Sequence, residues 1–430
     1  MNSAFDVVVV GAGPGGIAAA AVAAEAGARV CLLDDNGQPG GQIWRGYRSE
    51  TAPKYPHGRE FLKWTSRLHR TDCDIWSGWR ATDQPAAHCL RLESDGETRD
   101  IEFRSLVVAT GARERFLPFP GWTLPGVTGA GGLQALVKSG LDPRGKRVVV
   151  AGTGPLLLAI AAGLAGAGAE ILGIYEQAPR SRLLTFGLSL AALPQKLIEG
   201  AGYRRKTVRA PYRTNCWITR AEGSTRLESV TVTNGRRQWT LACEWLACGF
   251  HLVPNLELPR LLGCRIADGY VSVDALQQSS IAAVACIGEL TGIGGMDKAL
   301  LEGQIAGLAA VGRQSAADAL ASRLIPMQRF ARKLDRAFAL RDELKTLAAP
   351  DTVVCRCEDT DYSELMECSS WREAKLHTRC GMGACQGRVC GAATEFLFGW
   401  QHSGVRPPVF PSSVSTVAAK ADLPDAIPLS

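Results

Sequence analysis

The chain has 430 residues, of which 46% are hydrophobic and 21% are charged, so it is long enough for about three globular domains with cores of their own. Its formal net charge of +6 is small for this length, and it has no long block of Lys and Arg with interleaved aromatic residues, which argues against nucleic acid as a partner. Without a targeting segment, we expect a cytoplasmic protein whose 14 cysteines are thiols or metal ligands rather than disulfides.

The stretch from Val7 to Asp34 contains every part of a nucleotide-binding βαβ unit. Four consecutive valines are typical of a buried parallel strand, and the G-x-G-x-x-G spacing that follows allows a tight turn and close approach of a pyrophosphate. A helix of small residues comes next, and a second strand ends at an acid that can accept the ribose hydroxyls. The alternative is a plain glycine-rich turn in an α/β domain. The candidate cofactor-binding residues are Gly11, Gly13, Pro14, Gly15, Gly16, Asp34 and Asp35.

Three later segments are expected to complete the site of this first unit. Residues 39–44 form a turn whose side chains could stack on and hydrogen-bond a ring system, although an ordinary loop explains them equally well. Residues 106–113 are an apolar strand that ends in Thr-Gly. Residues 281–289 are a strand that ends in Gly-Glu before a helix, which could face the ribityl and phosphate end of a flavin or be a connection without a ligand. The candidate residues are Gly41, Gln42, Thr110, Gly111, Gly288 and Glu289.

A second βαβ unit begins at Arg147 and repeats the first two glycines as Gly152 and Gly154. The third glycine is replaced by Leu157, which would hold the helix and strand further apart, and the acid at Glu176 is displaced from the expected position. We therefore expect a Rossmann-like fold here, whereas binding of a second adenine nucleotide, NAD or ATP, stays open. This apolar stretch and the N-terminal one are unsuited to span a membrane, because both carry loop glycines.

Six cysteines lie between residues 355 and 390, a density that needs an explanation. A C-x-C pair and a C-x4-C pair on two short loops can bind a 2Fe-2S cluster, and neighbouring glycines let backbone N–H groups turn toward sulfide. The predicted ligands are Cys355, Cys357, Cys385 and Cys390. Cys380 is a fifth candidate, because it also forms an x4 pair with Cys385, while Cys368 is interpreted as packing. Structural zinc, whose pairs usually have x2 to x4 spacing, and free thiols are the alternatives.

Together these elements predict an α/β fold with two Rossmann-like dinucleotide-binding domains, in the architecture of disulfide reductases, and a small α-rich 2Fe-2S domain. The strand at 281–288 returns to the first domain, which is therefore discontinuous. An Asn234-Gly235 turn predicts a hairpin in the second domain. The expected limits are 1–115 and 250–314 for the FAD-binding domain, 116–249 for the second nucleotide-binding domain, 315–349 for a helical linker, 350–400 for the 2Fe-2S domain and 401–430 for an extended tail.

The whole set of motifs resembles one family of bacterial flavoproteins. The motifs are GAGPGG, PGGQIWR, ATGARER, PGWTLPGVTGAGGLQ, GTGPLLLA, CRCED and GMGACQGRVCG. They are similar to the α or A subunits of heteromeric flavin dehydrogenases, which include opine oxidases, D-hydroxyproline and dye-linked proline dehydrogenases and the flavoprotein subunit of hydrogen cyanide synthase. The C-terminal motifs are similar to the 2Fe-2S domain of bacterioferritin-associated ferredoxin. The resemblance implies that Cys385 and Cys390 form the second ligand pair, and the chain departs from the family at Cys380, where alanine is usual.

The resemblance implies an electron-transfer subunit with FAD and a 2Fe-2S cluster, while an amino-acid-oxidase-like β subunit oxidises a secondary amine or amino acid such as an opine, proline or D-hydroxyproline. It also allows a small ferredoxin-like γ subunit, an acceptor in the respiratory chain and peripheral association with the inner membrane. No His/Asp or paired-carboxylate group marks a substrate site, so the catalytic residues are unknown. The alternatives are a self-sufficient NAD(P)H-dependent flavin reductase, a hydrogen cyanide synthase subunit oxidising glycine, and a non-catalytic nucleotide-binding scaffold.

Overall fold

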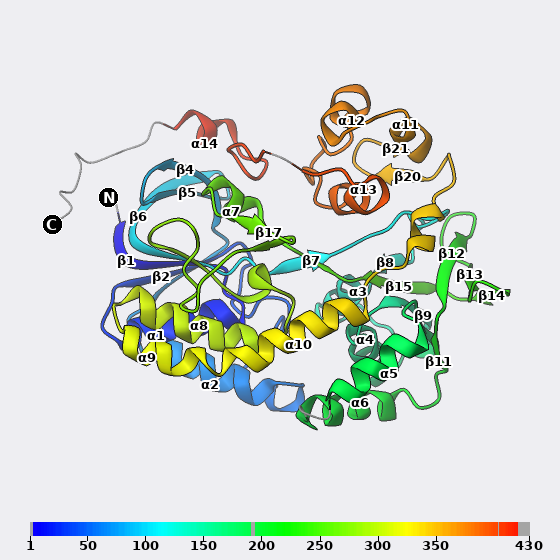
Figure 1. Ribbon diagram of the computed structural model, residues 1–430, viewed down its shortest axis with the longest axis horizontal. Helices are drawn as coiled ribbons and strands as arrows, with labels where there is room; N and C mark the ends of the chain where they lie inside the picture. Colours follow the sequence, from blue (N-terminus) through cyan, green and yellow to red (C-terminus); the bar gives the residue numbers. More distant parts are fainter. Residues whose placement is uncertain (1–2, 191–193, 403, 420–430) are drawn as a thin grey trace. The chain divides into compact units, whose positions relative to one another are not determined.

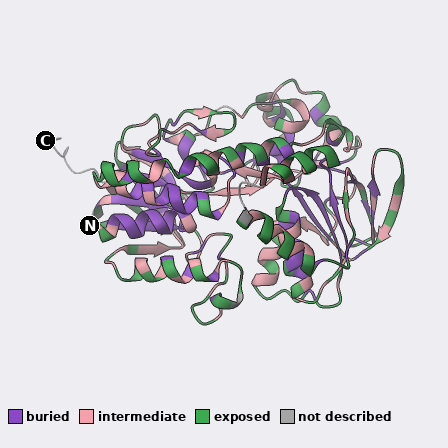
Figure 2. Ribbon diagram, turned by 60° about the horizontal axis from the view of Figure 1, so that its bottom comes forward, coloured by how far each residue is buried: buried purple, intermediate pink, exposed green. Residues whose placement is uncertain are grey.

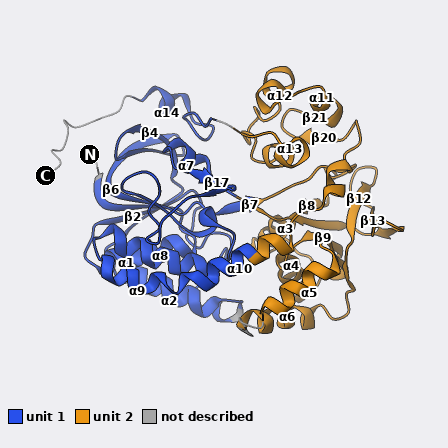
Figure 3. Ribbon diagram, viewed as in Figure 1, with its two compact units in different colours: residues 1–113, 254–332, 404–430 blue, residues 114–253, 333–403 orange. Residues whose placement is uncertain are grey.

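A computed structural model describes residues 3–190, 194–402 and 404–419 of the chain. They form two compact units, each assembled from segments that lie far apart in the sequence (Figure 3). Unit 1 takes residues 1–113, 254–332 and 404–430, and unit 2 takes residues 114–253 and 333–403. The chain leaves unit 1 through β7 (Ala112–Glu114) and returns through β16 (Leu252–Pro254), and these two strands pair with each other.

Unit 1 is built on a sheet in which the strands follow the order β3-β2-β1-β6-β5-β4, with β19 paired to the end of β6. Strands β1, β2, β4, β5 and β6 of this sheet are labelled in Figure 1. Strands β3, β2, β1, β6 and β19 pair in parallel with their neighbours in this group. Strands β5 and β4 extend the sheet beyond β6 as antiparallel strands. All residues of β2 are buried, as a central parallel strand requires. The strands are β1 (Ser3–Val10), β2 (Val30–Asp34), β3 (Asp74–Ser77), β4 (Arg80–Ala86), β5 (Cys89–Ser94), β6 (Glu97–Val108) and β19 (Val284–Cys286).

Helices α1 (Pro14–Glu25) and α8 (Met296–Ala310) of unit 1 pack closely, because glycines line their contact. A Cβ atom on Gly303 would lie 2.1 Å from the backbone oxygen of Gly15, so a larger residue would push the helices apart. This close packing fixes the position of α1, whose N-terminus follows the first glycines of the glycine loop at residues 11–16. Unit 1 also contains η1 (Ala52–Lys54), α2 (Gly58–His69), α7 (Glu257–Leu261), β17 (Ile266–Ala267), β18 (Tyr270–Val271), η3 (Gly288–Thr291), α9 (Gln314–Ala321) and most of α10 (Leu324–Ala337).

The C-terminal tail packs on unit 1 and is not simply extended, which differs from the expectation from the sequence. Residues Val414–Ala418 form helix α14, in which Thr416 is buried and its hydroxyl lies 2.7 Å from that of Thr98. Arg91 donates a hydrogen bond of 2.6 Å to the carbonyl oxygen of Ala419 while its guanidinium pairs with Asp100 at 2.8 Å. Residues 420–430 of the expected tail lie outside the described residues.

Unit 2 contains a parallel sheet in the order β11-β10-β9-β15-β8 and an antiparallel sheet in the order β12-β13-β14. The Asn234-Gly235 turn joins β13 and β14 into the expected hairpin, and Asn234 N donates to Arg237 O at 3.2 Å. The elements are β8 (Val127–Gly129), α3 (Ala130–Lys138), β9 (Arg147–Thr153), α4 (Leu156–Gly166), β10 (Glu170–Glu176), α5 (Arg180–Ser189), α6 (Pro194–Lys206), β11 (Tyr212–Thr214), β12 (Trp217–Glu222), β13 (Ser229–Thr233), β14 (Gln238–Ala242) and β15 (Trp245–Phe250).

The cysteine-rich segment completes unit 2 with a small helical part. Its core contains Val354, Leu365, Ala374 and Trp400 together with buried cysteines. The elements are η4 (Asp342–Thr346), β20 (Val353–Cys355), β21 (Thr360–Asp361), α11 (Tyr362–Met366), α12 (Trp371–Thr378) and α13 (Cys390–Phe398). Buried residues gather in the sheets and in the helices that cover them (Figure 2). Among the described helices, none has the length and apolar character needed to cross a membrane.

Candidate functional site

The glycine loop of unit 1, residues 11–16, has one packed side and one open side. A Cβ atom on Gly11 would lie 2.3 Å from Ala109 O, and one on Gly16 would lie 1.8 Å from Gly11 O, so both positions need glycine for packing. Nothing lies within 4 Å of a Cβ atom placed on Gly13. Helix α1 begins at Pro14 without a side-chain cap. The open side and the uncapped helix N-terminus are suited to a phosphate group.

Asp34 lies at the end of β2 beside this loop, whereas Asp35 faces outward. Asp34 is buried, and its carboxylate accepts hydrogen bonds from Ala12 N at 2.6 Å and from Asn36 N at 2.8 Å. Asp35 is exposed and lies 3.7 Å from the guanidinium of Arg80. Of the two predicted acids, only Asp34 is brought to the glycine loop.

The loop at residues 39–44 lies directly against the glycine loop. Gly40 N donates to Ala12 O at 2.7 Å, and a Cβ atom on Gly41 would lie 2.9 Å from the Cα atom of Gly13. Gln42 is exposed and accepts a hydrogen bond from Arg45 at 3.2 Å. The sequence allows Trp44 to stack on a ligand ring, but it is fully buried, with its ring centroid 5.7 Å from that of Phe61. Its indole therefore belongs to the core.

The strand end at Thr110 and Gly111 is held by Asn255. The Thr110 hydroxyl donates to Asn255 O at 3.0 Å, the Asn255 amide donates to Thr110 O at 2.7 Å, and Asn255 N donates to Gly111 O at 3.0 Å. The left-handed φ of +66° at Gly111 favours glycine. These bonds hold the chain in place just before it leaves unit 1.

A buried ion pair holds the backbone of Gly288, and it was not identified from the sequence. Lys298 and Glu302 are 2.8 Å apart with side chains 2% and 0% exposed. Lys298 donates to Gly288 O at 2.9 Å, and Glu302 accepts from Gly288 N at 2.7 Å. Glu289 accepts from the backbone of residues 294 and 295, and burial raises the pKa of its carboxyl. An i,i+4 Lys/Glu pair in an otherwise apolar helix was the available signal.

In the second βαβ unit the acid is not displaced, which corrects the expectation from the sequence. Glu176 pairs in register with Gly152, and its fully buried carboxylate accepts from Gly154 N at 2.7 Å and from the Thr153 hydroxyl at 2.8 Å. Leu157, in place of the third glycine, is buried in the core between sheet and helix. The fold repeats that of unit 1, and in both units the acid is bonded to the backbone of its own loop.

Residues 338–341 cover this second glycine loop. The Thr153 hydroxyl contacts Phe338 O at 3.3 Å, and the buried amide of Gln177 donates to Thr153 Oγ1 at 3.0 Å and to Ala339 O at 3.2 Å. Arg341 donates from its backbone to Gln177 at 3.2 Å and places its guanidinium 3.7 Å from the centre of the Trp217 ring. The chain therefore occupies space at the carboxyl edge of β9 and β10, where Rossmann folds bind nucleotides.

Unit 2 also brings together a His/Asp pair, although none is expected from the sequence. His251 Nε2 lies 3.4 Å from Asp335 Oδ1, and His251 has a left-handed φ of 74°. Burial lowers the pKa of His251, so its imidazole is neutral near pH 7. That no His/Asp pair marks a substrate site stays a prediction. The catalytic residues remain unassigned, because no described group links this pair to a substrate.

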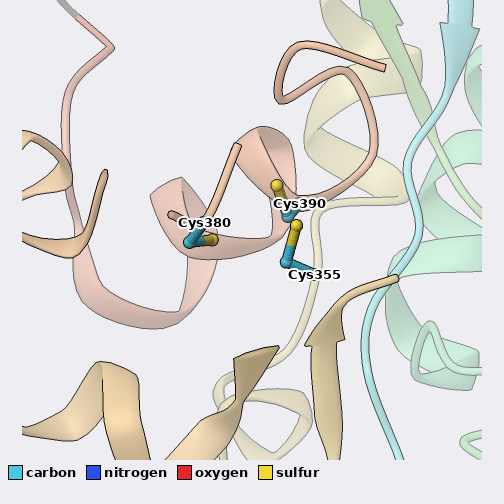
Figure 4. Close-up of side chains that lie close together, drawn as sticks. All are labelled: Cys355, Cys380 and Cys390. Atoms are coloured by element: carbon cyan, nitrogen blue, oxygen red, sulfur yellow. The ribbon is translucent and has the colours of Figure 1, made fainter. Parts of the chain in front are cut away.

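Three cysteine sulfurs of the C-terminal segment converge (Figure 4). The Sγ atoms of Cys355, Cys380 and Cys390, here called the buried triad, all lie within 4.8 Å of one another. They come from the end of β20, the loop after α12 and the start of α13. Two of the predicted ligands thus meet, and the third sulfur belongs to Cys380.

The other two predicted ligands form what we call the outer pair. Cys357 is exposed and Cys385 is half-buried, and the proximity of Cys385 shifts the pKa of Cys357. Cys368 is separate, since its sulfur contacts Glu364 O at 3.6 Å. Five of the six clustered cysteines therefore fall into two adjoining groups, a donor set that suits an iron–sulfur cluster.

Close contacts between the sulfurs shift the pKa values of the buried triad. The thiols of Cys380 and Cys390 interact with the sulfur of Cys355 and lower the pKa of Cys355 to about 2. The same contacts raise the pKa of Cys380 to about 12 and also raise the pKa of Cys390. Gly381 N donates to Cys355 Sγ at 3.5 Å, which is the N–H to sulfur contact expected from the glycines. The environment of Cys355 therefore favours a thiolate.

Glycines and a tryptophan shape this site. A Cβ atom on Gly381 would lie 2.4 Å from the ring of Trp371, and one on Gly383 would lie 2.3 Å from the Cβ atom of Cys357. Trp371 in turn stacks on His402 with ring centroids 4.1 Å apart. Arg379, which precedes Cys380, pairs with Glu358 at 2.8 Å, so its charge is partly neutralised.

Comparisons with known proteins agree with this architecture. The profile of the family described as "Pyridine nucleotide-disulphide oxidoreductase" matches residues 5–314. The A subunit of opine oxidase from Rhizobium meliloti is 33% identical, with 97% of this chain and 99% of that protein covered. The HcnB subunit of hydrogen cyanide synthase from Pseudomonas protegens is 32% identical, with 89% of each covered.

Solved structures show the same fold. L-proline dehydrogenase from P. horikoshii has a TM-score of 0.70 at 18% identity and covers 97% of this chain and 80% of its own. T. acidophilum thioredoxin reductase has a TM-score of 0.56 at 20% identity and covers 73% of this chain and 100% of its own. The chain is therefore an oxidoreductase that belongs to the pyridine nucleotide-disulphide oxidoreductase family, together with the A subunits of opine oxidases and HcnB.

Proposed function

We propose that this chain is the FAD- and 2Fe-2S-containing electron-transfer subunit of a heteromeric dehydrogenase that acts on a secondary amine or an amino acid. The observation that carries the proposal is the presence of two different binding sites on one chain. Unit 1 offers an open glycine loop beside Asp34, and unit 2 offers three converging cysteines with a second cysteine pair nearby. The first suits a dinucleotide and the second an iron–sulfur cluster.

The residues of unit 1 would bind and orient FAD. The open side at Gly13 and the N-terminus of α1 would receive the pyrophosphate, and Asp34 would accept the ribose hydroxyls. The backbone at Gly288, held by Lys298 and Glu302, would lie at the flavin end of the cofactor.

In unit 2, the buried triad and the outer pair would hold the cluster. When bound, the flavin takes up electron pairs and the cluster carries single electrons. The remaining contribution of the chain is to fix both groups and to tune the cluster through N–H to sulfur bonds such as that of Gly381.

Amine oxidation itself is assigned to an amino-acid-oxidase-like partner subunit. The relatives support this division, since both the opine oxidase protein and HcnB are named as subunits, at 33% and 32% identity. Opines, proline and D-hydroxyproline are the preferred substrate class, and glycine is the second candidate because the match to HcnB is almost as strong. A respiratory-chain acceptor and a ferredoxin-like γ subunit would complete the path.

A self-sufficient NAD(P)H-dependent reductase is disfavoured by the second Rossmann-like fold. Residues 338–341 occupy the edge of β9 and β10, where Phe338 contacts Thr153 and Ala339 accepts from Gln177. A nicotinamide dinucleotide would have to displace this segment. We therefore propose that the second fold binds neither NADH nor NADPH.

The test is to purify the chain alone and together with its partner subunits from the native host. We expect the isolated chain to contain flavin, iron and sulfide but to oxidise none of the substrates opine, proline, D-hydroxyproline and glycine with a dye acceptor. The complex should oxidise one of them, and anaerobic addition of that substrate should produce the electron paramagnetic resonance signal of a reduced cluster.

Three results would overturn the proposal. Full substrate oxidation by the isolated chain would place the active site on this subunit. Rapid anaerobic bleaching of the flavin by NADH or NADPH would favour the reductase. A cluster that stays oxidised while the complex turns over would favour a scaffold role.

A further inference from the structure

The buried end of the cysteine site holds one sulfur more than a 2Fe-2S cluster needs there. Such a cluster takes four thiolates, two on each iron. The outer pair, Cys357 and Cys385, supplies two, while the buried triad offers three sulfurs for the other two positions. Of the two irons, the one beside the buried triad is here called the buried iron. The extra sulfur is therefore available to the buried iron and not to the one beside the outer pair.

The distances allow more than one pair within the triad to bind one iron. Two thiolates on a single tetrahedral metal ion with bonds of about 2.3 Å lie about 3.8 Å apart. The three Sγ atoms of Cys355, Cys380 and Cys390 all lie within 4.8 Å of one another. Side-chain rotation that moves a sulfur by about 1 Å would bring any two of them onto one iron.

Cys380 is held in this position by its surroundings. Its backbone N–H donates to the hydroxyl of Thr378 at 3.3 Å, and Thr360 donates to the carbonyl oxygen of Thr378 at 3.1 Å. The preceding Arg379 has a left-handed φ of 59°, and the following Gly381 packs under Trp371. The side chain is fully buried, so its sulfur stays among the ligands rather than in solvent.

Cys355 differs from the other two members of the triad. It accepts the N–H of Gly381 and lies two residues before Cys357, which belongs to the outer pair. It therefore connects the buried and outer ends of the site. Cys380 and Cys390 reach it from two separate segments, the loop after α12 and the start of α13 (Figure 4).

We propose that Cys380 and Cys390 are interchangeable ligands of the buried iron, each able to bind beside Cys355. In the exchange one iron–thiolate bond breaks and another forms, the released thiolate takes up a proton and the incoming thiol gives one up, so charge is conserved. This inference rests on the proposed 2Fe-2S site. Within the described part of the chain, the outer pair has no comparable reserve.

The test compares four variants of the full chain: Cys380→Ser, Cys390→Ser, the double variant Cys380→Ser/Cys390→Ser, and Cys385→Ser as the matched control in the outer pair. Iron, acid-labile sulfide and the visible bands are measured after anaerobic reconstitution, and flavin content with thermal unfolding checks the fold. We expect both buried single variants to keep at least about half of the wild-type iron and sulfide. The double variant and Cys385→Ser should fall at least about tenfold.

A second measurement is independent of cluster yield. In this proposal Cys390 is the ligand in the wild type and Cys380 binds when Cys390 is absent. The exchange changes the geometry at the buried iron, so the reduced Cys390→Ser protein should give a shifted paramagnetic resonance spectrum, while Cys380→Ser should match the wild type. Loss of the cluster from Cys390→Ser, with flavin and fold intact, would overturn the inference and leave the proposed function standing. Retention of the cluster by the double variant would also overturn it. A wild-type chain that binds no iron and sulfide would overturn both.

Discussion

The carboxylate of Glu176 accepts a hydrogen bond of 2.7 Å from the backbone N–H of Gly154. In unit 1, Asp34 makes a similar bond of 2.6 Å to Ala12 N, which lies one position earlier in its loop. In both βαβ units the acid is thus tied to the glycine loop. They differ in what surrounds that contact, because residues 338–341 cover only the loop of unit 2.

The buried carboxyl of Glu176 should make stability depend on pH. Burial raises its pKa to about 7 from an ordinary value of 4.5, against hydrogen bonds that lower it. Since the folded pKa is the higher one, the stabilising contribution is complete below about pH 4.5 and is lost as the pH rises through about 7. The side chain of Glu176→Gln cannot ionise, so the unfolding free energy of this variant should depend less on pH than that of the wild type. Between about pH 5 and 8, the two changes in unfolding free energy should differ by at most about 3 kcal/mol.

Chemical unfolding of wild type and Glu176→Gln across this pH range measures the effect. Glu244→Gln is the control, because Glu244 pairs with Lys146 at the surface and its pKa is lowered. Identical pH profiles for wild type and Glu176→Gln would contradict the prediction.

Asp34 and Asp35 should differ in their effect on flavin binding. Asp34→Asn keeps the size of the side chain but removes the charged acceptor beside the glycine loop, so FAD affinity should fall at least about tenfold. Asp35→Asn should bind FAD like wild type, since Asp35 is exposed beside Arg80. Titration of the flavin-free proteins with FAD measures both affinities. Equal losses in the two variants would show that Asp34 is not the specific ribose-binding acid.

Variants at two glycines of the same loop should differ, one in the stability of the protein and the other in its affinity for FAD. Gly16→Ala places a Cβ atom 1.8 Å from Gly11 O and should destabilise the flavin-free protein by about 1–3 kcal/mol or more. Gly13→Ala meets no atom within 4 Å, and its φ of −74° suits alanine, so the flavin-free protein should unfold like wild type. Its added methyl group faces the open side and should weaken FAD binding. Unchanged FAD affinity in Gly13→Ala would place the pyrophosphate elsewhere.

The buried pair of Lys298 and Glu302 should behave as a unit. Lys298→Met leaves the Glu302 carboxylate buried without its cation and should cost about 3–5 kcal/mol. Lys298→Met combined with Glu302→Gln removes both charges while keeping an acceptor for Gly288 N, so its cost should be smaller than the sum of the two single variants. Urea unfolding of all four proteins completes the cycle. Additive costs would argue against direct coupling.

Local patterns were enough to predict the first nucleotide-binding unit. The valine run, the glycine spacing and the acid at Asp34 correspond to β1, α1 and the end of β2, because each depends on residues close together in the chain. The fold class and the hairpin at Asn234 and Gly235 were also correct, and the family comparisons confirm the former.

Contacts between distant segments could not be predicted in this way. Phe338 lies on Thr153, His251 meets Asp335, and Trp44 is buried beside Phe61, and no periodicity within a short window encodes these pairs. The displacement inferred for Glu176 was wrong because spacing was counted without knowing the strand register. Cys380 is similar, since its sequence spacing allows a ligand role but only the fold shows its sulfur beside two predicted ligands. The ligand set itself stays a prediction.

The return of the tail to unit 1 means that the cysteine-bearing segment is an insertion with two attachment points. Excising it would require cleavage on both sides, near residues 333 and 403. A single protease nick after the cysteines would leave them covalently connected to unit 1 through α10, while Arg91 would lose the Ala419 carbonyl only if the freed peptide diffused away. A fusion partner placed after residue 419 would therefore be joined to the polypeptide through unit 1, not through the cysteine-bearing segment.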